Sequence, residues 1–164
     1  MITLSMKSTR RGIVIFLAII AIILFSNLPN AIAGDYLGEF CWLYQQTENA
    51  QGAVTKAPVL VRFGVTSMGN NYYTLQGSTV QVTDDNPAIF GGTAVIIGND
   101  VFLTMETSQQ HLTKPYRDSG VGQAHLALET LSGTFWGNAM NFDTQARVTG
   151  TFYSAGTMTF TTCP

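Results

Sequence analysis

The stretch Val59-Leu60-Val61-Arg62-Phe63-Gly64-Val65-Thr66 decides the fold class. Its odd-numbered positions are all large and apolar, while its even-numbered positions include an arginine, a glycine and a threonine. This period of two is typical of a β-strand with one face in a core. The segment 40–45 repeats the pattern, because Phe40, Trp42 and Tyr44 share one parity.

Similar segments, separated by turn signals, continue to the end of the chain. The pattern predicts strands at 40–45, 59–66, 72–82, 93–97, 101–107, 124–131, 134–142, 147–153 and 157–162, and no helix from residue 34 onward. An open sheet of this size would leave two unpaired edges, which closure would remove. We therefore expect an all-β fold, a closed antiparallel up-and-down β-barrel of about eight strands, with a β-sandwich as the alternative.

The two cysteines stand near the two ends of this region, at Cys41 and Cys163. In a closed meander with an even number of strands, the first and last strands are antiparallel neighbours, so the start of one lies beside the end of the other. Parity places both thiols on the more polar face, away from Trp42 and Phe160. We expect a Cys41–Cys163 disulfide on the barrel wall, which a sandwich with adjacent terminal strands would also allow.

Residues 1–33 have the pattern of an export signal. Lys7, Arg10 and Arg11 precede an unbroken apolar run at 13–25, and residues 31–33 form a small-x-small cleavage site. The run would give a helix of roughly 20 Å, shorter than the ~30 Å hydrocarbon core of a membrane. We expect a cleaved signal peptide at 1–33, a single domain at 34–164 with no membrane span, and a periplasmic or extracellular location; an uncleaved anchor is the alternative.

Charge excludes some partners. Charged residues make up 11% of the chain, against ~25% in typical soluble proteins. Removal of residues 1–33 leaves five Lys and Arg against ten Asp and Glu. We expect no nucleic-acid partner, since phosphate binding needs clustered cations.

Motifs for catalysis or metal binding are scarce. The chain has no metal-binding histidine motif, no nucleophile elbow and no phosphate loop. His125 and Glu129 share strand parity, which predicts a pair on the outer face. We expect no cofactor and no metal, and an enzyme is the least favoured function.

The predicted barrel has material for a binding site. Eight strands enclose a space just wide enough to pack shut or to hold one small ligand. By their alternation along the predicted strands, Gly137, Ala139 and Gly150 should face the interior of the barrel. Their small size would leave space there for a ligand. Residues 108–123 form the longest segment without a strand pattern, which predicts a loop at the mouth. The residues that we expect to bind a ligand are Phe40, Trp42, Tyr44, Phe63, Met105, Tyr116, Arg117, Phe135 and Phe152.

One motif resembles a known family. Tyr36-Leu37-Gly38-Glu39-Phe40 is similar to the first-strand motif of lipocalins, Tyr-x-Gly-x-Trp, with Phe40 in the place of the tryptophan. The resemblance implies a calycin-type barrel that carries a small, largely apolar ligand in its mouth.

The sequence thus favours an exported protein that binds a small apolar molecule. The alternatives are a structural or interaction protein with a packed barrel, which would use Trp136, Met140 and Phe142 on its outer face, and a small enzyme. The sequence leaves the oligomeric state open.

Overall fold

The described part of the chain is a sheet without helices. The structure, a computed structural model, describes residues 34–80, 88–110 and 116–164, which lie within one compact unit, Ala33–Pro164. The predicted export signal at 1–33 lies outside the described residues. The strands are β1 (Asp35–Asn49), β2 (Gly52–Ala53), β3 (Val59–Gly69), β4 (Tyr72–Thr79), β5 (Ala88–Ile97), β6 (Asp100–Gln110), β7 (Tyr116–Ala127), β8 (Ser132–Asp143) and β9 (Val148–Thr161).

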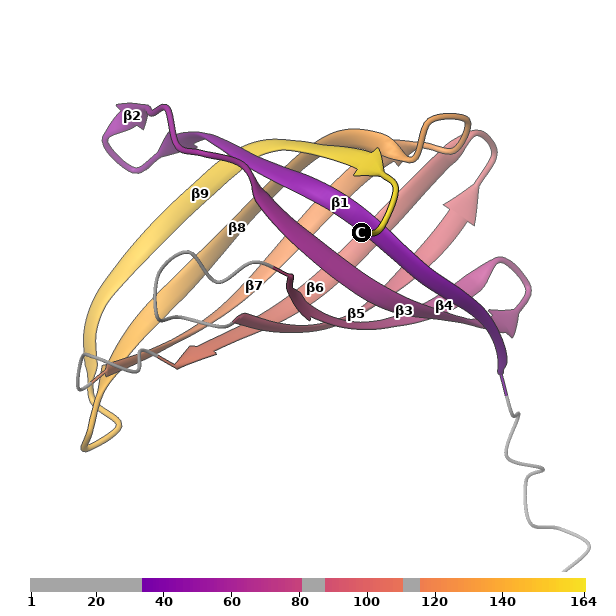
Figure 1. The fold of residues 1–164 in the computed structure, drawn as a ribbon. Coiled ribbons are helices and arrows are strands. Elements are labelled where there is room, and N and C mark those ends of the chain that lie inside the picture. Colours follow the sequence, from indigo (N-terminus) through magenta and orange to yellow (C-terminus); the bar gives the residue numbers. More distant parts are fainter. Residues whose placement is uncertain (1–33, 81–87, 111–115) are drawn as a thin grey trace, which may run out of the picture. The chain divides into compact units, whose positions relative to one another are not determined.

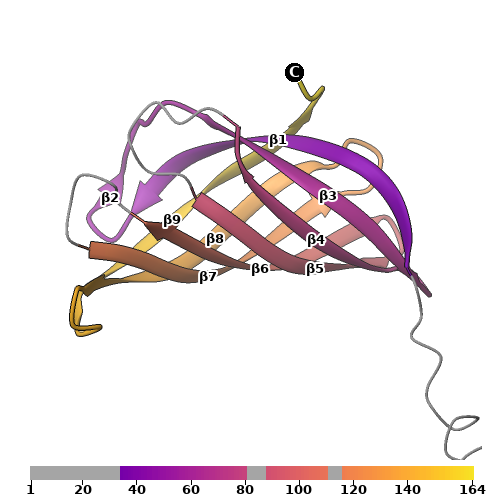
Figure 2. The ribbon, with the colours of Figure 1, turned by 60° about the horizontal axis from the view of Figure 1, so that its bottom comes forward.

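The strands form a ring. From β3 to β9 each strand pairs antiparallel with the next, and β1 pairs with both β3 and β9. Eight strands therefore close on themselves, while the short β2 pairs only with the end of β1. Figures 1 and 2 show these strands wrapped around a common axis with a pronounced tilt. The predicted closed, up-and-down, barrel-like fold is confirmed.

The two ends of the ring differ in their connections. At the near end, where β1 begins, strands are joined by residues 70–71, 98–99 and 128–131. Asn70 and Asn71 have φ of 52° and 60°, as the commonest two-residue hairpin turn requires, and Gly98 has φ of 62°. At the far end, where β1 ends, the connections are 50–58, 80–87, 111–115 and 144–147. The described connections at the near end are thus tight turns, whereas the first one at the far end, 50–58, is longer.

Three predictions about the strands are wrong. The strand predicted at 124–131 ends at Ala127, and 128–131 form the β7–β8 turn. Residues 108–123 are not a loop, since 108–110 belong to β6 and 116–123 to β7. Their inner positions include Asp118, Gly120 and Gly122, so the ladder continues without the apolar alternation that marks a strand. Residues 147–153 and 157–162 are not separate strands, because β9 runs unbroken through Ser154 and Gly156.

The core follows the predicted parity. The inner side chains of Trp42, Val61, Phe63, Leu126 and Met158 are buried, and Phe63 and Met158 have no exposed surface. Large-to-small substitution of such a residue, Phe to alanine for example, costs ~3–5 kcal/mol. The interior is therefore the apolar face of the sheet, as the sequence predicts.

A disulfide joins the first strand to the residues that follow the last strand. Cys41 and Cys163 are bonded, with their Cα atoms 5.2 Å apart. Cys41 lies opposite Arg62 on β3 and Thr161 on β9, which is the outer face. Cys41 is nevertheless fully buried, and the Arg62 side chain donates a 3.3 Å hydrogen bond to the Pro164 carbonyl oxygen. The bridge thus ties the C-terminal residues to the outside of the wall where the ring closes.

Replacement of both cysteines by alanine should destabilise the domain strongly. The bridge spans 122 residues, and closing so long a loop restricts the unfolded chain by about 4–5 kcal/mol in the entropic model. Urea unfolding followed by circular dichroism should show this loss in the double variant and, equally, in the wild type with a reductant. An unfolding midpoint that is insensitive to reductant would contradict the prediction.

The seam between β1 and β9 contains a position that requires glycine. Gly156 lies opposite Gln46, next to the register shift between Gln46 and Glu48. A Cβ atom at Gly156 would lie 2.0 Å from the carbonyl oxygen of Gln45 and 3.0 Å from the Cα atom of Gln46. Because both are backbone atoms, the clash would force the two closing strands apart.

Gly156→Ala should therefore lower the free energy of unfolding by about 1–3 kcal/mol or more, because overpacking a core typically costs this much. Gly91→Ala is the matched control, since a Cβ atom there has no other atom within 4 Å. The control should change the free energy of unfolding by no more than about 0.5 kcal/mol. Equal unfolding free energies for the two variants would show that the seam tolerates a side chain.

Candidate functional site

A central layer of side chains divides the interior. This layer contains the buried side chains of Phe63, Met105 and Met158. They line neither of the two cavities in the interior, one at the far end and one at the near end. The Tyr44 hydroxyl donates a 2.9 Å hydrogen bond to the sulfur of Met105, and burial raises the pKa of Tyr44. The Phe63 and Phe90 rings pack edge to face, with centroids 5.8 Å apart. The interior is therefore not one continuous cup.

The far-end cavity lies between this layer and the far opening. It has a volume of about 180 Å³. The Tyr44 ring stands 5.1 Å from the Phe135 ring and 6.1 Å from the Phe90 ring, between centroids, and these three rings form an aromatic base. The remaining lining residues are Ala88, Thr107, Gln109, Asp118, Gly120, Val121, Gly122, Trp136, Gly137, Asn138, Ala139, Phe152 and Ser154.

The space exists because one wall of this cavity carries almost no side chains. In the β7–β8 ladder, Gly120 lies opposite Ala139 and Gly122 lies opposite Gly137. These four neighbouring positions point inward, where larger residues would fill the volume. A flat wall of backbone and methyl groups facing aromatic rings suits a slender or planar apolar group.

Polar groups surround the entrance to this cavity. A vestibule of about 450 Å³ shares Gln109, Asp118, Phe152 and Ser154 with the far-end cavity. The Asn141 side-chain amide donates a hydrogen bond to the Asp118 carboxylate. Other lining residues of the vestibule are Gln46, Asn49, Ala50, Gln51, Lys56, Thr151 and Tyr153. A ligand could therefore place a polar group here while its apolar part reaches the aromatic base.

Backbone contacts hold the segment beside this vestibule. The Val54 N–H donates a 2.9 Å hydrogen bond to the Thr47 carbonyl oxygen. The Gln45 side chain donates another to the carbonyl oxygen of Lys56. The 50–58 connection is thereby pinned to β1, which keeps its part of the rim in place.

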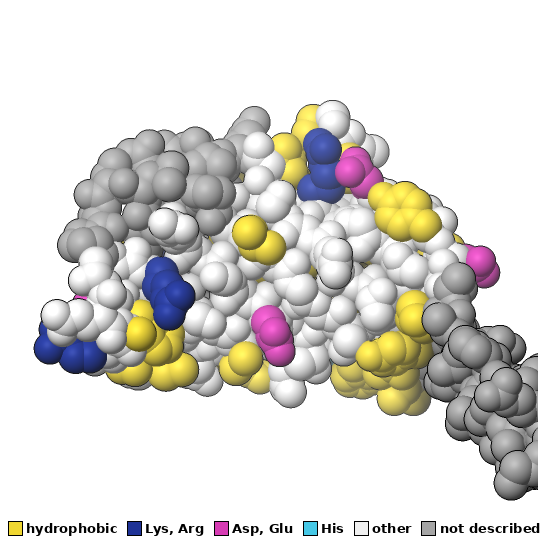
Figure 3. All heavy atoms as spheres, turned by 90° about the horizontal axis from the view of Figure 1, so that it is seen from below, with side chains coloured by type: hydrophobic (Ala, Val, Ile, Leu, Met, Phe, Trp, Pro, Cys, Tyr) yellow, Lys and Arg dark blue, Asp and Glu magenta, His cyan; other side chains and the backbone are white. Residues whose placement is uncertain are grey.

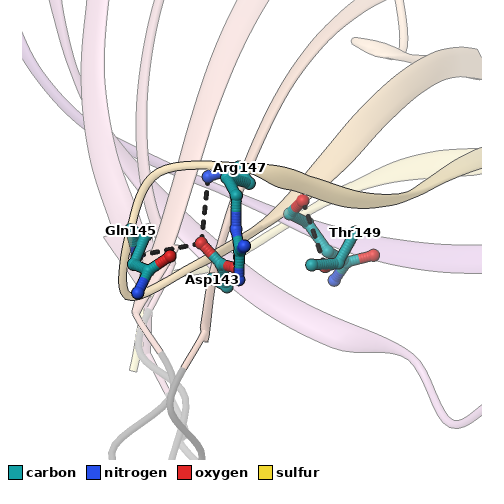
Figure 4. A network of polar contacts seen from close by, with 5 residues as sticks. Asp143, Gln145, Arg147 and Thr149 are labelled. Atoms are coloured by element: carbon teal, nitrogen blue, oxygen red, sulfur yellow. Dashed lines mark hydrogen bonds and ion pairs between the residues drawn. The ribbon is translucent and has the colours of Figure 1, made fainter.

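The β8–β9 turn at the far end is held by Asp143 (Figure 4). Its carboxylate accepts 2.9 Å hydrogen bonds from the backbone N–H groups of Gln145 and Arg147, and a 2.8 Å bond from Nε of Arg147. The bonds from Arg147 are the main cause that lowers the pKa of Asp143. The hydrogen bonds that hold the turn are therefore retained at every pH at which the Asp143 carboxylate is ionised, including neutral pH.

A second cavity occupies the near end. Its volume is about 150 Å³, and it shares no lining residue with the far-end cavity. Its lining residues are apolar or aromatic: Leu37, Phe40, Trp42, Val65, Tyr73, Leu75, Ala94, Ile96, Val101, Leu103, Leu126 and Leu131. The Trp42 indole N–H donates a 2.7 Å hydrogen bond to the Leu131 carbonyl oxygen, which anchors the β7–β8 turn over this end.

The structure separates the residues that the sequence assigns to a ligand. Phe40 and Trp42 line the near-end cavity, whereas Tyr44, Phe135 and Phe152 line the far-end cavity. The rest line neither: Phe63 and Met105 belong to the central layer, Tyr116 lies at the far end opposite Asp143, and Arg117 lies opposite Phe142 with its guanidinium carbon 5.8 Å from that ring.

Sequence reasoning misses the polar rim and several lining glycines. Gln109 and Asp118 fall in the segment that was predicted to be a loop, so their inward direction could not be inferred. Gly120 and Gly122 fall there too, whereas Gly137 and Ala139 have the predicted inner parity and do line the far-end cavity. An alternation of small residues with larger polar ones was the available signal for β7.

The histidine prediction needs one correction. His125 pairs with Asp100, not with Glu129, through a 2.7 Å contact between Nε2 and Oδ1. Glu129 lies beyond the end of β7, in the turn, while Asp100 sits on the neighbouring β6. Phe102 stacks on the imidazole with centroids 4.9 Å apart. His111, the other histidine, lies outside the described residues.

Within residues 34–80, 88–110 and 116–164 there is no group of three His, Cys, Asp or Glu side chains that could hold a metal ion. Over the same ranges, no helix is long and apolar enough to cross a membrane.

The outer face is mostly uncharged. On the side shown in Figure 3, a basic and an acidic side chain lie next to each other near the top, and the other charged side chains are scattered among larger areas that are neither charged nor hydrophobic. On β7 and β8, Val121, Trp136 and Met140 are exposed by 62%, 42% and 42%. Val121 lies opposite Asn138, between the other two along β8, so the three exposed side chains make one outer patch, although Val121 and Trp136 also border the far-end cavity.

Comparisons of this chain with protein-family models, with curated proteins and with solved structures found no match.

Proposed function

We propose that this protein is an exported, disulfide-closed β-barrel that binds a small, largely apolar ligand at its far end. The observation that carries the proposal is the far-end cavity itself, an aromatic base facing a wall of glycine and alanine. Protein cores are packed to the density of organic crystals, and voids larger than a water molecule are few. A wall kept free of side chains beside an opening is the arrangement expected of a binding site.

The chemistry of the lining supports a ligand with one polar end. Tyr44, Phe90 and Phe135 offer ring surfaces at the base, while Gln109 and Ser154 stand where the cavity meets the vestibule. Apolar area removed from water contributes roughly 25 cal/mol per Å², so the buried part of the ligand would supply most of the affinity. The polar rim would orient it.

The proposed location outside the cytoplasm rests on two features. The pattern at 1–33 is that of a signal peptide. The Cys41–Cys163 bridge is compatible with an oxidising compartment, where disulfides persist.

Binding can be tested with N-phenyl-1-naphthylamine, a neutral dye that becomes fluorescent in apolar surroundings. The wild type should give a saturable rise in emission at one equivalent. Ala139→Leu and Ser154→Leu, which fill the far-end cavity from β8 and β9, should each weaken binding at least tenfold. Ala94→Leu, which fills the near-end cavity instead, is the matched control and should bind the dye as the wild type does.

Circular dichroism and thermal unfolding should show that the three variants fold. Undiminished dye binding by both far-end variants, or a wild type without a saturable signal, would rule out a far-end site for apolar ligands.

A second candidate function is an interaction through the outer patch of Val121, Trp136 and Met140. The exposure of these three side chains on adjacent strands favours it, since contiguous exposed apolar groups mark interaction surfaces.

Sedimentation velocity at several protein concentrations tests this second candidate by self-association. If copies of the chain associate through the patch, the wild type should sediment faster as concentration rises, and Val121→Thr combined with Trp136→Gln should abolish the effect. Ile89→Thr, at another exposed apolar position on β5, is the control and should leave the association unchanged. A wild type that stays monomeric would remove self-association through this patch.

A further inference from the structure

The near-end cavity is separate from the proposed ligand site in both position and chemistry. The two cavities have no lining residue in common, and on β6 the buried Met105 stands between Leu103 of the near-end lining and Thr107 of the far-end lining. Whatever occupies one cavity therefore does not have to enter the other. This inference does not rest on the proposed function.

The lining of the near-end cavity offers few hydrogen-bond partners to water. A buried water needs two to four polar partners. Among the lining side chains only Trp42 and Tyr73 carry a polar atom, and the Trp42 N–H is already bonded to the Leu131 carbonyl oxygen. A carboxylate or an ammonium group would likewise lose its hydration without gaining a partner.

The size of the cavity suits an occupant of about one ring. An apolar cavity of about 150 Å³ lined by leucine, isoleucine and phenylalanine in another protein stays dry and binds benzene or xenon. The near-end cavity has the same volume, about 150 Å³, and similar side chains. The Phe40 and Trp42 rings on its wall stack at 6.1 Å with an interplanar angle of 19°, which adds aromatic surface.

Two rim residues lie outside the regular ladder. Leu37 sits in the register shift between Tyr36 and Gly38 at the start of β1. Leu131 sits in the β7–β8 turn with φ of 49°. The other lining residues belong to paired strands, so entry from the near end would pass these two leucines.

We propose that the near-end cavity is a second binding site, specific for a compact, uncharged apolar molecule of about one six-membered ring. Trp42 lines the cavity, while Trp136, the other tryptophan of the chain, lies on the outer face. A Trp136→Phe variant therefore leaves one tryptophan, and its emission reports directly on the site.

Bromobenzene is the probe, because its heavy atom quenches tryptophan emission on contact. In the Trp136→Phe protein we expect saturable quenching that removes at least half of the Trp42 emission. Adding Ala94→Leu, which fills the cavity from β5, should weaken this binding at least tenfold. Ile96→Phe, at a half-buried lining position, is a second filling variant that the fold can accommodate more easily.

Two further measurements separate this site from the far end and from non-specific quenching. Ala139→Leu should leave bromobenzene quenching unchanged, even if the far-end proposal fails. 4-Bromobenzoate, which has the same ring with a carboxylate, should quench only linearly with concentration. Linear quenching by bromobenzene itself, saturable quenching that survives both filling variants, or equal binding of 4-bromobenzoate would each overturn the proposal.

Discussion

The hydrogen-bonded seam between β1 and β9 is the constraint on which the rest of the structure depends. Without it, the sheet would be open, and its inner face would lose the opposite wall against which it packs. The seam brings Trp42 next to Phe160 and Tyr44 next to Met158, pairs more than 110 residues apart in sequence. Gly156 permits the close approach of the two strands, and the Cys41–Cys163 bridge holds their outer side. Both interior cavities exist only because this seam closes.

Closure also explains why the interior is divided in two. In a ring of eight strands, side chains from opposite walls meet across the axis. Phe63 from β3, Met105 from β6 and Met158 from β9 do so at mid-height and are buried. At the near end the lining side chains are mostly large and apolar, and the space lies among them. At the far end the inner residues of β7 and β8 are mostly glycine and alanine, so the space there results from missing side chains. The two cavities therefore differ in origin as well as in chemistry.

The polar groups follow the same division. The far end carries Gln109, Asp118 and Asn141 on its inner or rim positions, together with the Asp143–Arg147 turn. The near-end lining offers only the Tyr73 hydroxyl beyond the engaged Trp42 indole. A ligand that needs hydrogen bonds can be satisfied at the far end, whereas the near end favours a molecule that needs none. This difference in the available partners, more than cavity size, separates the two proposed sites.

The sequence by itself determined the strand character and predicted the closure and the disulfide, while the pairing of β1 with β9 excluded the sandwich. Alternation in 59–66 and 40–45 and the placement of Cys41 and Cys163 near the two ends of the meander are local or topological signals, which need no coordinates. Only the tertiary structure decided how the inner residues are shared between two cavities, and that Arg117 lies over Phe142 and His125 beside Asp100. Parity tells which face a side chain occupies. Its height along the barrel and its partner across the axis depend on the tilt and stagger of all eight strands together. Residues 108–110 and 116–123 lack the strand signal because ladder hydrogen bonds to the neighbouring strands hold them, and not an apolar face of their own.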